Sequence, residues 1–180
     1  MKRNRKDHGF MSLRVEGGIL PPEFLQTISS LKTLKQTGPD YSISTNLNIK
    51  EEIGRYWRIA QGLWEDYKDR LNQENISQSD ACIKYWLCGI LVQVLGFRDV
   101  NAISPIPLGD RVFPINYKTA NGAVPLVLTT KDFDLDNSHQ KFGDEGRRRP
   151  PHELLQEYLN AEDACLWGMV SNGTKIRLLR

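Results

Sequence analysis

Two neighbouring stretches near the end of the chain decide the fold: PPHELLQEYLN at 150–160 and LWGMVSNGTKIRLLR at 166–180. The first begins with prolines, which suit the first turn of a helix, and continues as a helix with a polar face. The second predicts an apolar strand, a tight turn at Asn172-Gly173 and a second strand, because both turn residues tolerate the positive φ of a type I′ turn. The chain stops at Arg180, on a strand, so we expect a module of a longer protein.

Three earlier segments are expected to be helical. A short helix is expected at 23–31, after a pair of prolines. At 49–71 the apolar residues recur every three or four positions on one broad face, and Asn48 can cap the first turn. The segment 80–95 is apolar on most sides and is followed by Gly96, the residue type favoured just past a helix end. We expect this third helix to be the most buried element.

The middle of the chain has strand-like segments and polar connections. Short β-prone segments at 97–103 and 110–118 precede the stretch 123–130, which has the apolar run of a buried strand. The tripeptide Ala-Asn-Gly at 120–122 predicts a second hairpin turn. The stretch 132–149 is polar and contains glycines, so we expect a mobile loop there.

The order of these elements predicts an α+β (or α/β) fold, with a helical N-terminal part packed on a small mixed sheet. We expect a mobile basic tail at 1–10, a helical segment at 11–75 and a sheet-containing core at 76–180. The helical segment and the core are expected to form one compact domain.

Composition excludes several classes of protein. Its 180 residues, 39% hydrophobic and 26% charged, are typical of a soluble globular domain. The net charge of +2 creates no general attraction for nucleic acid, although basic clusters at 2–6 and 147–149 can neutralise phosphates or be a solvated tail and loop. The three cysteines have no CxxC pair and the three histidines have no metal-ligand spacing, which argues against a metal site or a disulfide framework. Without a membrane-spanning run or signal peptide, we expect no membrane partner and a cytoplasmic location.

Two local patterns have alternative interpretations. The alternating acids Asp132, Asp134 and Asp136 suggest calcium, but the glycine that a calcium turn requires is missing, so a solvated loop is favoured. The four tryptophans could stack on bases, yet three fall on apolar helix faces and the fourth opens an apolar strand. Core packing is therefore expected for them.

One predicted hairpin has the frame of a metal-dependent nuclease site without its acids. Such sites hold Mg²⁺ with carboxylates on two neighbouring strands, and a lysine two residues after the second acid orients water. Here Thr129 stands in the position of that acid, Lys131 supplies the lysine, and Asn116 occupies the first strand. Threonine and asparagine lack the charge that a hard divalent cation requires, so we expect no metal site unless Asp110, Asp132 or Glu153 supplies it.

Several stretches together have a familiar pattern: LRVEGGILPPEFL at 13–25, residues 85–97, parts of 113–136, and the helix and hairpin at 150–173. They resemble the N-terminal region of large bacterial restriction–modification and phage-defence proteins, type IIG-like, that carry an adenine-specific DNA methyltransferase in the same chain. The resemblance implies a restriction-endonuclease-like fold at the head of a longer enzyme. The chain lacks the Asn-Pro-Pro-Tyr type of motif for the flipped adenine and a glycine-rich cofactor turn. The cofactor S-adenosylmethionine would therefore bind only in a part outside this chain.

The resemblance also implies roles for individual residues. Gln156 and Tyr158 occupy the helix that follows the Glu-x-Lys strand in the nuclease superfamily, which makes them, with Lys131, candidates for supporting a catalytic site. The expected phosphate contacts with double-stranded DNA are Lys131, Arg147, Arg148, Arg149 and Lys175. Three functions remain open: a DNA-contacting or docking module without its own catalysis, joined to a methyltransferase in the same parent protein or a neighbouring gene product; a Mg²⁺-dependent DNA endonuclease; and an inactive truncated fragment.

Overall fold

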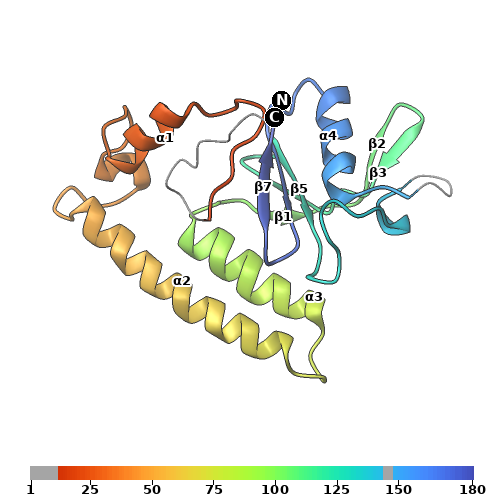
Figure 1. The fold of residues 1–180 in the computed structure, drawn as a ribbon, viewed down its shortest axis with the longest axis horizontal. Coiled ribbons are helices and arrows are strands. Elements are labelled where there is room, and N and C mark those ends of the chain that lie inside the picture. Colours follow the sequence, from red (N-terminus) through yellow and green to blue (C-terminus); the bar gives the residue numbers. More distant parts are fainter. Residues whose placement is uncertain (1–11, 144–147) are drawn as a thin grey trace, which may run out of the picture. The chain divides into compact units, whose positions relative to one another are not determined.

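The chain divides into two compact units. The computed structural model describes residues 12–143 and 148–180, and the division falls between Gly54 and Arg55 (Figure 1). The described part of the first unit holds helix α1 (Pro22–Ser29), the 3-10 helix η1 (Gly38–Tyr41) and the first turn of the long helix α2 (Ile49–Leu71). The expected helix after the proline pair is confirmed. Pro22 is its first residue, a position where the N–H would have no hydrogen-bond partner within the helix, so proline is tolerated there.

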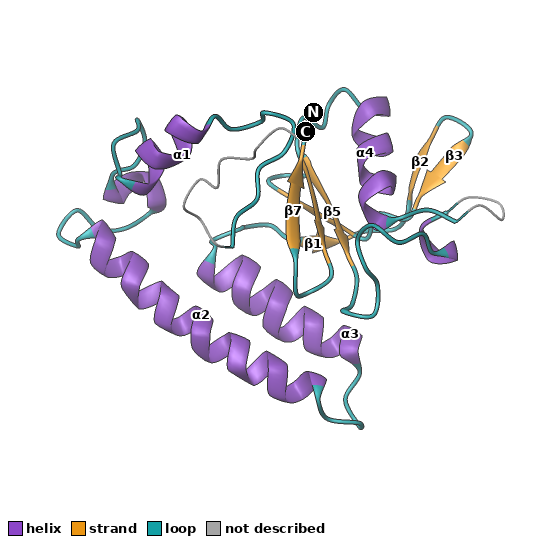
Figure 2. Ribbon diagram, viewed as in Figure 1, coloured by secondary structure: helices purple, strands orange, loops and turns teal. Residues whose placement is uncertain are grey.

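The second unit is built around a mixed sheet, whose strands are drawn in orange in Figure 2. The sheet has five strands in the order β1-β4-β5-β6-β7. Its strands are β1 (Asn101–Ala102), β4 (Tyr117–Thr119), β5 (Val124–Leu128), β6 (Gly168–Ser171) and β7 (Ile176–Leu179). Strands β5 and β6 are parallel, with Leu126 opposite Met169, and the other neighbouring pairs are antiparallel. Strands β2 (Ile106–Leu108) and β3 (Arg111–Phe113) form a separate antiparallel hairpin. The expected α+β class with a mixed sheet is confirmed.

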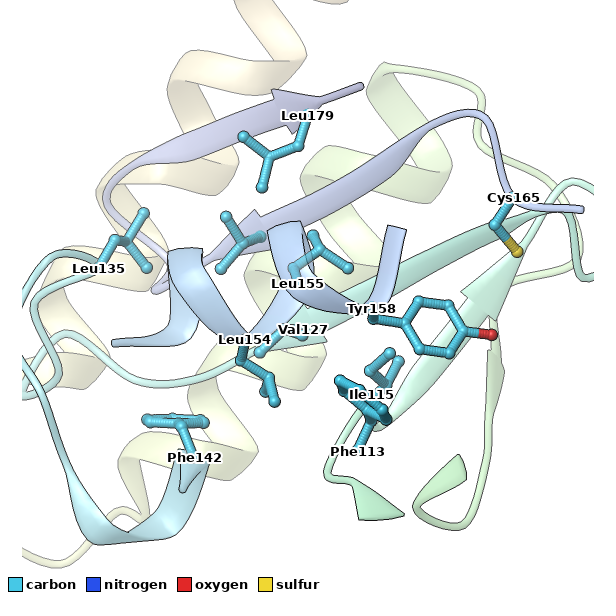
Figure 3. Close-up of a cluster of buried hydrophobic side chains, with 11 residues drawn as sticks. Phe113, Ile115, Val127, Leu135, Phe142, Leu154, Leu155, Tyr158, Cys165 and Leu179 are labelled. Carbon is cyan, nitrogen blue, oxygen red and sulfur yellow. The ribbon is translucent and has the colours of Figure 1, made fainter. Parts of the chain in front are cut away.

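One face of the sheet is covered by helix α4 (Pro151–Ala161), which also connects the parallel strands β5 and β6. Its apolar side chains Leu154, Leu155 and Tyr158 lie in one cluster with Val127 of β5 (Figure 3). Val170 of β6 belongs to the same cluster. The helix lies close to β6, because a Cβ on Gly168 would come within 3.0 Å of Leu155 Cδ1. Glycine at this position therefore permits the close approach.

The opposite face carries a second apolar cluster. Helix α3 (Gln78–Ala81) continues directly into the π-helix η2 (Cys82–Val94), and both pack with the later turns of α2 on β5 and β6. Leu126 and Met169 from the strands meet Tyr67 from α2 and Leu87 from η2 in this cluster. Because strand side chains alternate between faces, β5 and β6 are buried on both sides.

The helices of this unit follow their local sequence signals, with two differences. Helix α2 has the expected bounds, and the N–H of Lys50 donates to the side chain of Asn48 at 2.9 Å. The third helix ends as expected, with Gly96 at φ +73°, but most of it is π-helical, as in the bond from Leu95 N to Ile90 O. The expectation that it is the most buried element is wrong, because all four residues of β6 are buried.

The turn between β6 and β7 differs from the predicted type I′ turn. Ser171 is opposite Ile176, which leaves the four residues 172–175 in the turn, and only Gly173 among them has positive φ, at +79°. Asn172 instead accepts hydrogen bonds through its side chain from the N–H groups of Thr174 and Lys175, at 3.1 and 2.9 Å. An asparagine that closes a turn with its side chain does not need a left-handed backbone.

The other predicted hairpin turn is confirmed. Ala120, Asn121 and Gly122 all have positive φ, and β4 and β5 pair antiparallel on either side of them.

The stretch expected to be a mobile loop is well packed where the structure describes it. Between residues 132 and 143, Leu135 and Phe142 are 0% and 2% exposed and belong to the cluster under α4. The N–H of His152 donates to Leu135 O, and the side chain of Asn172 donates to Phe133 O. The expectation of mobility is therefore wrong for this part, because buried apolar side chains and hydrogen bonds tie it to α4 and to the β6–β7 turn.

Gly173→Ala is expected to lower the free energy of unfolding by roughly 2–5 kcal/mol, because an alanine is strained at positive φ and its Cβ would overlap the hydroxyl of buried Tyr67. Gly122→Ala is the matched control, because Gly122 has φ +87° but nothing within 4 Å of the added Cβ. The control is expected to lose only about 1 kcal/mol. Urea unfolding of both variants measures the difference, and equal losses would contradict the overlap with Tyr67.

Candidate functional site: the basic edge after strand β5

Asn116, which stands where a metal-dependent nuclease would hold an acid, lies just before β4, because the predicted strand at 110–118 is divided into β3 and β4. Asn116 Nδ2 donates to Leu128 O at 2.8 Å, and Asn116 Oδ1 accepts from Leu128 N at 2.9 Å. The side chain thereby satisfies the last residue of β5 as a neighbouring strand would. Both polar atoms of the Asn116 side chain are therefore used to bind the backbone at the end of β5.

The corresponding position on the second strand is buried. Thr129 is 4% exposed, its N–H donates to Ser171 O at 2.9 Å, and its hydroxyl has no hydrogen-bond partner among the described residues. Two residues later the chain reaches the surface, and Lys131 is exposed. Asp110 and Glu153, which could have supplied a metal ligand, are exposed at the tip of the β2–β3 hairpin and on α4. In the described ranges no three of the His, Cys, Asp and Glu side chains form a group that could hold a metal ion.

Gln156 and Tyr158, the two residues of α4 to which the resemblance assigned a supporting role, have different environments. Tyr158 is 1% exposed and packs edge to face on Phe113, with ring centroids 5.3 Å apart. Burial, together with the neighbouring Cys165, raises the pKa of Tyr158 to about 12. Gln156 is partly exposed on the same helix. The structure thus places Tyr158 in the core under α4 (Figure 3).

The arginines before α4 differ sharply in exposure. Arg148 is exposed, whereas the side chain of Arg149 is 14% exposed and pairs with Glu157 at 2.5 Å. Glu157 also pairs with Arg111 of β3, so one carboxylate joins the hairpin, α4 and the segment before it. The third member of the predicted cluster, Arg147, lies outside the described residues.

Two further cations pair with the acids that suggested calcium. Lys175 Nζ lies 3.2 Å from Asp134 Oδ2. Arg177 forms a bidentate ion pair with Asp136, in which each guanidinium nitrogen lies 2.6 Å from a carboxylate oxygen. The N–H of Asp136 is the main cause that lowers the pKa of Asp134, with Lys175 next, and the bond from Arg177 lowers the pKa of Asp136. These pairs hold the segment after β5 against β7 on either side of buried Leu135.

The tryptophans divide between core and surface. Trp86 is buried, and Trp64 lies 6.4 Å from it, centroid to centroid, as expected for core residues. Trp57 is 64% exposed, so the expectation of core packing is wrong for it. Its place on the broad apolar face of α2 gave no local sign of this difference.

The segment after Lys131 contains a compact group of aromatic and basic side chains that was not predicted from the sequence. His139 and Phe142 both pack edge to face on Phe133, with centroid distances of 4.7 and 5.6 Å. Lys141 places its ammonium 5.2 Å from the centre of the Phe133 ring. The only available signal was the interleaving of aromatic and basic residues within a polar stretch.

The stability of the protein in acid depends on the ion pairs of Asp134 and Asp136. The pKa values of Asp134 and Asp136 are lowered in the folded state, so their contribution to stability is present above pH 4 and is lost as the pH falls through the folded-state values. The double variant Asp134→Asn/Asp136→Asn is therefore expected to lose less stability than the wild type between pH 7 and pH 2.5. Urea midpoints at both pH values provide the measurement.

The control for this experiment replaces two other exposed acids, Asp110→Asn and Asp163→Asn, for which the described residues show no ion pair. This control should keep the acid sensitivity of the wild type. Identical pH dependence of the test variant and the control would contradict the role given to the two pairs.

Comparison with known proteins adds no family to this picture. The chain matches no family model, no curated protein and no solved structure. Within the described residues no helix is long and apolar enough to cross a membrane. The functional assignment therefore depends on the geometry and charge of the described residues.

Proposed function

We propose that the chain is a DNA-contacting or docking module of a bacterial restriction–modification or phage-defence DNA methyltransferase, with a restriction-endonuclease-like fold and without its own catalysis. The observation that carries the proposal is the pair of exposed cations Lys131 and Arg148, for which no ion pair with a carboxylate is found in the described ranges. Both lie on the connection between β5 and α4. An exposed unpaired cation can neutralise a phosphate without first breaking an ion pair.

The five expected phosphate contacts are not equivalent in this proposal. Lys131 and Arg148 are the principal contacts because both are exposed. Lys175 is a weaker contact, since Asp134 lies 3.2 Å from its ammonium and competes with phosphate. Arg149 positions the segment through Glu157 and leaves little surface for DNA. A module of this kind would hold duplex DNA mainly through its backbone and add little sequence preference.

The absence of catalysis in this proposal is supported by the chemistry of the two hairpin positions. Mg²⁺ sites in proteins usually include one or two carboxylates together with water and substrate phosphate oxygens. Asn116 is neutral and uses both polar atoms on Leu128, and Thr129 is neutral and buried. The residues present therefore do not fit Mg²⁺ at this hairpin.

The proposed partner is the methyltransferase part, in the same parent protein or a neighbouring gene product. The resemblance of residues 13–25 and 150–173 to the heads of such enzymes supports this partner. S-adenosylmethionine would belong to that part, and the assembly would work in the cytoplasm, where bacterial DNA lies.

Adjacent arginines offer a matched test. Arg148→Ala is expected to weaken binding of a 30-base-pair duplex and to reduce the magnitude of the salt slope, d log K/d log[KCl], by about 1, because one phosphate contact is lost. Arg149→Ala is expected to leave the slope unchanged and to lower the free energy of unfolding by roughly 1–3 kcal/mol, because Glu157 loses a partly buried partner. Fluorescence anisotropy across KCl concentrations and urea unfolding measure the two effects.

Three results would count against the proposal. Equal slopes for the wild type and Arg148→Ala would remove Arg148 from the interface. A wild-type chain that binds no duplex at low salt would favour an inactive fragment. Nicking of plasmid DNA that requires Mg²⁺ and is abolished by Lys131→Ala would establish the endonuclease instead.

A further inference from the structure

The aromatic and basic group at 133–142 holds its polar groups in fixed positions. The Phe133 ring is flanked edge to face by His139 and Phe142, with interplanar angles of 87° and 85°. Lys141 Nζ lies 5.2 Å from the centre of the Phe133 ring and 5.7 Å from that of Phe142, so both rings attract the same ammonium. Phe142 is 2% exposed and anchors the group in the core under α4.

The orientation of the His139 ring follows from a backbone hydrogen bond. The N–H of Lys141 donates to His139 Nδ1 at 3.1 Å. An imidazole nitrogen that accepts a hydrogen bond carries no proton, so in the neutral ring the proton is on Nε2. Nε2–H is therefore a hydrogen-bond donor on an exposed residue.

A backbone bridge brings Arg148 to the same place. His139 N donates to Arg149 O at 3.0 Å, and Arg149 N donates to His139 O at 3.3 Å, which makes an isolated antiparallel bridge. The bridge places Arg148 directly before the residue that pairs with His139. Neither Lys141 nor Arg148 pairs with a carboxylate in the residues that the structure describes, and both are exposed.

We propose that His139 Nε2–H and the Lys141 ammonium form a preorganised contact for a phosphate of the duplex DNA backbone, beside Arg148. This inference depends on the proposed function and names two contacts that the sequence did not reveal. The rings already restrict the Lys141 side chain, so less conformational freedom is lost when it meets a phosphate than for an isolated surface lysine. A hydrogen-bond donor and a cation, two residues apart in the chain and packed on the same Phe133 ring, can both interact with phosphate oxygens.

The test compares three variants of the whole chain by anisotropy of a labelled 30-base-pair duplex across KCl concentrations at pH 8. Lys141→Gln is expected to weaken binding roughly three- to tenfold and to reduce the magnitude of the salt slope by about 1. His139→Asn keeps an acceptor for the Lys141 N–H but lacks a donor at the Nε2 position. It is expected to weaken binding several-fold with a smaller change in slope.

Lys68→Gln is the control, because Lys68 is a half-exposed lysine paired with Glu65 at 2.7 Å. The Lys68→Gln variant should bind the duplex as tightly as the wild type.

The outcomes separate this inference from the function on which it depends. If the wild type binds DNA and both test variants bind equally well, with thermal melts that show folded protein, the contact is wrong and the DNA-binding function stands. If the wild type binds no duplex, both are wrong.

Discussion

The second unit depends on the burial of the parallel pair β5 and β6 on both faces. Val127 and Val170 face α4, while Leu126 and Met169 face η2 and α2. Each such side chain contributes about 1.5–3 kcal/mol when fully buried, and the two faces can be filled only if helices lie on both sides. Strands with no exposed face cannot present functional side chains along their length, so polar chemistry is confined to the connections at their ends.

The elements predicted well are those whose signals are local. The apolar period and the Asn48 cap of α2 lie within the helix itself, and the positive-φ residues of the β4–β5 turn are adjacent. The π-helical form of η2 was not predictable, because its sequence is apolar on most sides. In such a segment a change in the number of residues per turn does not alter the spacing of apolar and polar residues. Leu135 and Phe142 were missed because single apolar residues in a polar stretch have no period, although both reach the core.

The candidate site was less predictable than the fold, because its properties depend on partners distant in the chain. Arg148 and Arg149 are identical in type and adjacent, but only Arg149 meets Glu157 on α4. The pairing of Asp134 with Lys175 joins residues 41 positions apart. The sequence does not give the distance between a basic and an acidic residue that are far apart in the chain. Basic residues that form ion pairs can therefore be recognised only from the fold. The sequence therefore supplies a list of basic residues, and the fold shows which of the described ones are exposed and which are paired with acids.

The hydrogen bonds of Asn116 restrict which residues can replace it. Aspartate at this position could accept from the N–H of Leu128 but could not donate to its carbonyl, which would then face a negative charge. At the buried position of Thr129, a carboxylate would lose its hydration before any ion arrived to compensate. Either change alone would therefore lower the stability of the protein, because no bound cation would be present to compensate the new charge.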